Sequence, residues 1–81
     1  MKLRVLFFSV LKDITSAEEV PLEVPEGITI EQLLENLFTR WPALTEWEPS
    51  LLIAQNQTYT TRSEPVVDNA EIAIMPPVQG G

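Results

Sequence analysis

Alternation of apolar and polar side chains predicts that residues 2–10 form a β-strand. The side chains of one face are Leu3, Val5 and Phe7, and those of the other are Lys2, Arg4, Leu6 and Phe8. The second face begins with two cations and is therefore expected to face solvent. Two interpretations of its apolar members stay open: either both faces of the sheet are covered, or Phe8 belongs to a docking patch.

A second strand is predicted over residues 18–24, after a polar segment at 12–17 that is expected to be a turn. Val20, Leu22 and Val24 point to one side of this strand. Pro21 and Pro25 suit only an edge strand, because proline has no N–H group for a central ladder.

The clearest helix pattern lies between Thr29 and Trp41. Thr29 followed three residues later by Gln32 is a capping box, and Pro42 ends the helix. The apolar stripe consists of Ile30, Leu33, Leu34, Leu37, Phe38 and Trp41. Because one helix must cover one face of the sheet, this stripe is predicted to be core rather than a cofactor site.

The C-terminal half predicts further strands. The expected segments are an irregular link at 42–50, a strand at 51–56, a continuation or fourth strand at 57–61, a tight turn at 65–69 and a last strand at 70–75. Ile72 and Ile74 are expected to face inward, and Glu71, Ala73 and Met75 to face outward.

The first and last strands are the most apolar, so they are expected to lie side by side in the centre of the sheet. Because they are expected to run in the same direction, the helix is predicted to be their crossover. The pattern predicts an α+β, ubiquitin-like β-grasp roll with a mixed four- to five-stranded sheet on one main helix. The globular domain is expected to span residues 1–75, and residues 76–81 to form an extended, flexible C-terminal tail.

Composition narrows the possible chemistry. The 81 residues include no cysteine and no histidine, which removes thiolate nucleophiles, disulfides and the usual zinc ligands. The net charge of −7 disfavours nucleic-acid binding and favours a partner with a basic surface. The longest apolar run, Val5–Phe8, is too short to span a membrane, so a cytoplasmic protein is expected.

The C-terminal residues carry the candidate chemistry. Pro76 and Pro77 end the last strand and project the chain in an extended direction. Gly80 and Gly81 have no Cβ and can pass through a narrow channel. Over residues 76–81 such a tail reaches roughly 20 Å, far enough to place the terminal carboxylate inside another protein.

A carboxylate is a poor electrophile until it is activated, most simply as an acyl-adenylate made from ATP by another enzyme. Displacement by a sulfur donor then gives a thiocarboxylate, whereas displacement by an enzyme thiol gives a thioester and leads toward protein conjugation. Because this chain has no cysteine, its sulfur would come from elsewhere.

The sequence resembles the small, sulfur-carrying subunit of molybdopterin synthase, the MoaD family. The resemblance rests on Met1–Phe8 (MKLRVLFF), on Asn56-Gln57-Thr58 and above all on the ending Pro76-Pro77-Val78-Gln79-Gly80-Gly81. Two positions depart from the usual pattern. Met75 replaces a frequent aromatic residue, and Asp68-Asn69 replaces a frequent Asp-Gly turn.

The resemblance implies that an E1-like enzyme of the MoeB type adenylates Gly81, and that a cysteine desulfurase or rhodanese supplies the sulfur. The tail would then enter a large subunit of the MoaE type, within a heterotetramer, and convert cyclic pyranopterin monophosphate to molybdopterin. No cofactor is expected to be bound, and no metal. The implied contacts with the partner are Phe8, Tyr59, Met75, Pro76, Pro77, Val78 and Gln79, with Gly80 threading the channel.

Three other functions stay open on the sequence alone. The chain could be a sulfur carrier for thiazole synthesis or tRNA thiolation, or a ubiquitin-like modifier joined to lysines. It could also be a β-grasp binding module whose terminus has no chemical role.

Overall fold

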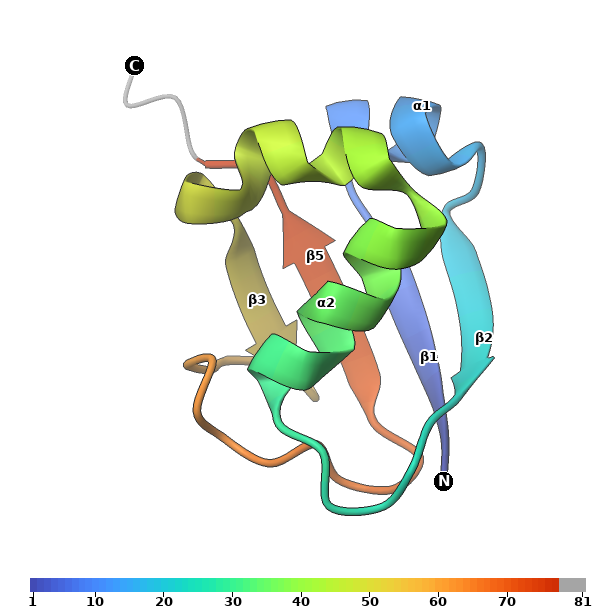
Figure 1. Ribbon diagram of the computed structural model, residues 1–81, viewed down its shortest axis with the longest axis vertical. Helices are drawn as coiled ribbons and strands as arrows, with labels where there is room; N and C mark the ends of the chain where they lie inside the picture. The colour runs from blue at the N-terminus through green and yellow to red at the C-terminus, as the bar shows by residue number, and fades with distance from the viewer. Residues whose placement is uncertain (78–81) are drawn as a thin grey trace.

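The computed structural model describes residues 1–77, in which helices cover one face of a five-stranded sheet (Figure 1). The strands are β1 (Lys2–Phe7), β2 (Glu19–Glu23), β3 (Leu52–Gln55), β4 (Thr58–Tyr59) and β5 (Glu71–Met75). The helices are α1 (Val10–Thr15), α2 (Ile30–Arg40) and the 3₁₀ helix η1 (Pro42–Ser50). The strand order is β2-β1-β5-β3-β4, so β1 and β5 lie side by side within the sheet.

The predicted pairing of the first and last strands is confirmed. β1 and β5 are parallel, with Val5 opposite Ile72 and Phe7 opposite Ile74. The neighbouring pairs, β1–β2 and β3–β5, are antiparallel. A mixed sheet with α2 crossing its face is the predicted β-grasp arrangement.

The core lies between α2 and the covered face of the sheet. Ile30, Leu33 and Leu37 of α2 are fully buried there. They pack against the side chains on the helix-facing side of the sheet, of which the most buried are Val5, Phe7, Ile72 and Ile74. Burying each such side chain stabilises the fold by about 1.5–3 kcal/mol.

The start of α2 is held by the predicted capping box. The backbone N–H of Gln32 donates to Oγ1 of Thr29 at 3.2 Å, and the backbone N–H of Thr29 donates to Oε1 of Gln32 at 2.9 Å. The loop after β4 satisfies two more donors of the first turn, because the Ile30 and Glu31 N–H groups donate to its carbonyls at 2.9 Å each. This loop therefore fixes α2 against the sheet.

β2 is an edge strand, as the prolines predicted. The N–H of Val24 donates to the Met1 carbonyl, and the N–H of Phe7 donates to the Glu18 carbonyl. In an antiparallel pair only every second residue of a strand forms hydrogen bonds with the neighbouring strand. Counting from the bonded residues Glu18 and Val24, Pro21 is a non-bonded residue, and its ring nitrogen faces away from β1. The absence of an N–H group at Pro21 therefore removes no hydrogen bond between β1 and β2. It does make the free edge of β2 a poorer template for pairing with a strand of another chain.

Four predictions of local structure were wrong or incomplete. The first strand ends at Phe7 rather than Val10, and most of the supposed turn at 12–17 belongs to α1. The supposed irregular link at 42–50 is the regular 3₁₀ helix η1, which buries Leu44 completely. The turn expected over residues 65–69 is confined to Asp68-Asn69, while Val66 is 5% exposed and belongs to the core.

Candidate functional site

The candidate site is the face of the sheet opposite the helices, called here the outer face. Register places four side chains in one row across it, because Leu6 pairs with Ala73, Ala73 with Ala54 and Ala54 with Tyr59. The two central members of the row are alanines. The middle of the outer face is therefore low, and larger side chains stand around it.

Phe8 and Met75 form the next row toward the tail. The N–H of Phe8 donates to the Ile74 carbonyl at 3.2 Å, which holds Phe8 beside β5 after β1 has ended. Phe8 is 43% exposed and Tyr59 is 69% exposed, so both rings present apolar area to solvent. Met75 pairs with Leu52 of β3 and is half-buried.

These residues enclose a hollow of about 390 Å³, called here the central hollow. Ala54 and Ala73 lie at its middle, and Phe8, Tyr59 and Met75 line it from three different strands or their ends. Gln57 and Glu71 complete its lining. An exposed apolar hollow with a few polar groups at its border is typical of a protein docking site.

A tight turn fixes where Phe8 points. The N–H of Leu11 donates to the Phe8 carbonyl at 3.1 Å, and Ser9 between them has φ 56° and ψ −134°. Few residues other than glycine take this conformation, so Ser9 stores local strain. The turn ends β1 abruptly and starts α1, which leaves Phe8 at the border of the sheet.

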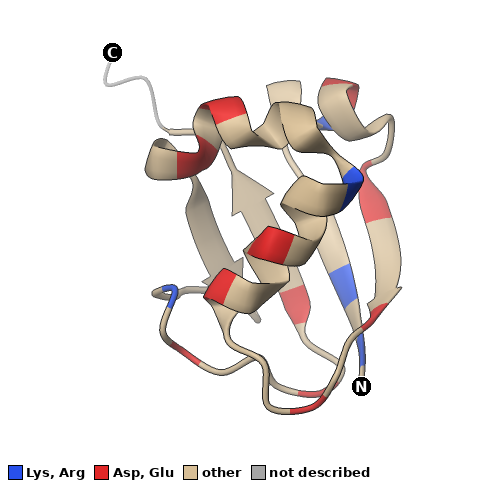
Figure 2. Cartoon of the chain, in the orientation of Figure 1, with Lys and Arg blue, Asp and Glu red and all other residues tan. Residues whose placement is uncertain are grey.

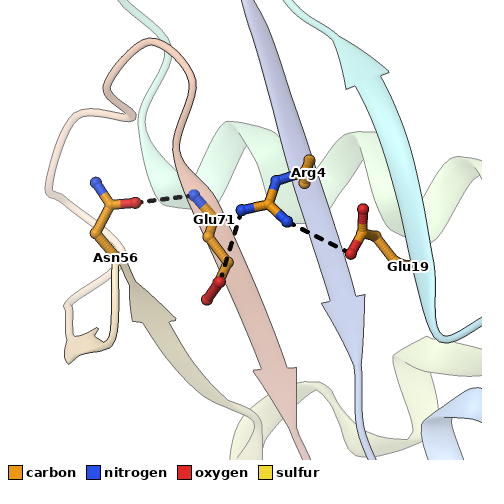
Figure 3. A network of polar contacts seen from close by, with 4 residues as sticks. All are labelled: Arg4, Glu19, Asn56 and Glu71. Carbon is orange, nitrogen blue, oxygen red and sulfur yellow. Dashed lines mark hydrogen bonds and ion pairs between the residues drawn. The ribbon is translucent and has the colours of Figure 1, made fainter.

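A polar network closes the other end of the outer face (Figure 3). Arg4 of β1 lies 3.5 Å from Glu19 of β2 and 3.7 Å from Glu71 of β5. Asn56 accepts a hydrogen bond from the Glu71 N–H through Oδ1 at 2.9 Å. The network joins three strands and the β3–β4 turn, and it sets a polar limit to the apolar surface.

The wider surface is acidic. Figure 2 shows acidic positions on α2, η1 and β2, which agrees with the net charge of −7. Within residues 1–77, no three carboxylates come together so as to hold a metal ion. In the same part of the chain, no helix is both long and apolar enough to cross a membrane.

The structure brings together three residues that the resemblance implied, Phe8, Tyr59 and Met75. Pro76 and Pro77 follow Met75 directly and are half-buried. The remaining tail residues, Val78, Gln79, Gly80 and Gly81, lie outside the described residues. Sequence reasoning missed Ala54, Ala73, Gln57 and Glu71 as lining of the central hollow, although the outward position of Glu71 and Ala73 followed from strand alternation.

Comparison with known families gives a match over nearly the whole chain. The ThiS family profile matches residues 5–81. A relative from Escherichia coli (strain K12) is 36% identical over 81 residues, covering 98% of this chain and 99% of the relative. A relative from Arabidopsis thaliana is 33% identical over 81 residues, covering 100% of this chain and 84% of the relative. Both relatives are named molybdopterin synthase sulfur carrier subunit.

Solved structures share the fold. A chain in the complex of subunits 1 and 2 of the molybdopterin-converting factor from Helicobacter pylori has a TM-score of 0.71 at 26% identity, with 100% of both chains covered. SAMP1 from Haloferax volcanii has a TM-score of 0.87 at 21% identity, again over 100% of both chains. The second likeness concerns the fold alone.

Proposed function

The chain belongs to the ThiS family, and on this premise we propose that it is the sulfur carrier subunit of a molybdopterin synthase. The observation that carries the proposal is the match, along almost its entire length, to relatives named molybdopterin synthase sulfur carrier subunit. The absence of cysteine and histidine fits this role, since a carrier needs only a terminal carboxylate and a docking surface.

The proposed chemistry takes place at Gly81. A carboxylate oxygen attacks the α-phosphate of ATP within an E1-like enzyme of the MoeB type, and pyrophosphate leaves. The terminal sulfur of a persulfide on a cysteine desulfurase or rhodanese then attacks the acyl carbon and displaces AMP, which gives an acyl disulfide. A second thiol of the enzymes involved cleaves the S–S bond of this intermediate and is itself oxidised to a disulfide. The product is a thiocarboxylate, whose sulfur is passed to cyclic pyranopterin monophosphate. Because activation consumes ATP, we place these steps in the cytoplasm.

The outer face is the proposed docking surface for the large subunit, of the MoaE type. Phe8, Tyr59 and Met75 would enter the interface as apolar contacts around the central hollow. β5 runs along this hollow and leads directly into Pro76 and Pro77. A partner seated on the outer face would therefore lie beside the root of the tail, where it can receive residues 78–81. Within that part, Gln79 and Val78 would contact the channel walls and Gly80 would pass its narrowest point.

Reconstitution tests the proposal. The chain carrying a thiocarboxylate at Gly81 is mixed with the large subunit and cyclic pyranopterin monophosphate, and molybdopterin is measured. We expect a stable complex and molybdopterin formation, and we expect a chain lacking Gly80 and Gly81 to bind without forming the product. Product formation by the shortened chain would contradict the proposal, as would the absence of any complex with the intact chain.

The same preparations separate the alternative functions. Covalent conjugates to lysines of other proteins, absent when Gly81 is deleted, would indicate a ubiquitin-like modifier. Sulfur transfer that supports thiazole synthesis or tRNA thiolation but not molybdopterin formation would indicate a carrier for another pathway.

A further inference from the structure

A second hollow lies on the opposite side of Phe8 from the central hollow. It measures about 290 Å³ and is called here the lateral hollow. Leu6 and Phe8 contribute apolar side chains to it, and Lys12, Glu18 and Glu19 are its charged members. Phe8 lines both hollows, so the two recesses belong to one continuous surface.

The charged groups of the lateral hollow form two exposed ion pairs. Lys12 Nζ lies 3.5 Å from Glu18 Oε1, and Glu19 Oε1 lies 3.5 Å from Nη1 of Arg4, which does not itself line the hollow. Exposed pairs of this kind contribute roughly 0–1 kcal/mol each, so a carboxylate can exchange one cationic partner for another at little cost.

The balance of charge at this hollow is negative. Two carboxylates, Glu18 and Glu19, and one cation, Lys12, line the hollow, so its lining carries one more negative charge than positive charges. Glu18 is the most accessible of these groups, with 84% of its side chain exposed. The chain as a whole carries a charge of −7, which adds a long-range attraction for a cation.

A side chain that fills the lateral hollow must have an apolar part to contact Leu6 and Phe8 and a charged or polar end to contact the charged border. An arginine or lysine has an aliphatic stem that packs on apolar surface and a cationic end that reaches carboxylates. A purely apolar side chain would leave the charged border unmatched, and an acidic one would be repelled by the surplus charge.

We propose that the lateral hollow receives a basic side chain, arginine or lysine, from the large subunit. Its stem lies against Leu6 and Phe8, and its charge lies against Glu18 and Glu19. This inference rests on the proposed function, because it takes the outer face as the docking surface. It extends that surface past Phe8 to β2 and α1, and makes Phe8 the ridge between two recesses that the partner fills.

The test compares two double variants of equal charge. Glu18→Gln/Glu19→Gln removes the two carboxylates at the lateral hollow. Glu23→Gln/Glu26→Gln removes two exposed carboxylates that do not line either hollow. Dissociation constants for the large subunit are measured at low and high ionic strength, with the intact chain and Phe8→Glu in parallel. Thermal unfolding of each free variant checks that the fold is retained.

We expect the first double variant to weaken binding by about tenfold or more at low ionic strength, and the control to weaken it by less than about threefold. The difference between the dissociation constants of the two double variants should become smaller at high ionic strength, since salt screens exposed charges. Equal weakening by both variants would overturn the inference, because it would mean that net charge alone matters. In that case binding of the intact chain and its loss in Phe8→Glu would leave the proposed function standing. No binding by the intact chain would overturn both.

Discussion

Replacing Phe8 by glutamate tests the assignment of the outer face. Phe8 is 43% exposed, follows the last residue of β1, and anchors to β5 through its backbone N–H rather than its ring. The core set of Val5, Phe7 and Ile74 lies on the other face and is untouched. The free variant should therefore unfold close to the temperature of the intact chain.

The effect on binding should be large. An aromatic side chain at the centre of an interface contributes about 2–4 kcal/mol when it is removed, and Phe8 lines both hollows. At about 1.4 kcal/mol for each factor of ten, the dissociation constant for the large subunit should rise roughly 30- to 1,000-fold. A buried, unpaired carboxylate would place the loss toward the upper end of this range.

Val67→Glu provides the matched control. Val67 is another exposed apolar residue, 45% accessible, but it lies in the loop before β5 and lines neither hollow. The two variants are compared by isothermal titration with the large subunit, and by circular dichroism melting of the free proteins. A melting curve that collapses only with Phe8→Glu would mean that Phe8 is a core residue. Equal loss of binding in both variants would mean that the outer face has no special role.

Three further predictions follow from burial and capping. Leu37→Ala, at a fully buried position, should lower the free energy of unfolding in urea titration by about 2–5 kcal/mol. Glu35→Ala, on the exposed side of α2, should change it by less than about 0.5 kcal/mol, and similar effects of the two variants would contradict the helical register. Thr29→Ala should cost about 0.5–2 kcal/mol because it removes the capping box, and an unchanged unfolding midpoint would contradict that role. Ala73→Leu fills the central hollow, so it should weaken binding of the large subunit by at least about tenfold while leaving the melting temperature nearly unchanged. Unchanged binding would show that the partner does not enter the central hollow.

Much of the fold could be predicted because its signals are periodic. Alternation in β1 and β5 assigned inward and outward side chains correctly, and the capping box and Pro42 gave the limits of α2 within a residue. The prolines of β2 identified an edge strand. Each of these signals is local and repeats along an element, so a single sequence is enough to show it.

The two missed helices lack such signals. α1 has only six residues, which is too few to show a helical period. It begins after Ser9, which has a positive φ, and the sequence gives no sign of this conformation because the residue is not a glycine. η1 contains Pro49 and is a 3₁₀ helix, whose spacing differs from the α-helical pattern. Both helices are stabilised by packing of Leu11 and Leu44 into the core, which depends on the rest of the fold.

The candidate site was predictable in part for a similar reason. The outward direction of Phe8 and Met75 followed from strand alternation. The central hollow did not, because it depends on register between strands, which brings Ala54 of β3 beside Ala73 of β5. Small residues carry no signal in a sequence, and they create a recess only through what surrounds them.

The most direct test of the account is the mass of the terminal residue. The chain is incubated with an E1-like activating enzyme, ATP and a sulfur donor, and its C-terminal peptide is analysed by mass spectrometry. We expect a gain equal to the difference between sulfur and oxygen, located on Gly81 and absent without ATP. A chain extended by one residue beyond Gly81 is the control for placement, because the extension shifts the terminus by about 3.3–3.6 Å in the large subunit and should prevent molybdopterin formation. No sulfur on Gly81 under these conditions, or molybdopterin formation by a chain without its tail, would contradict the account.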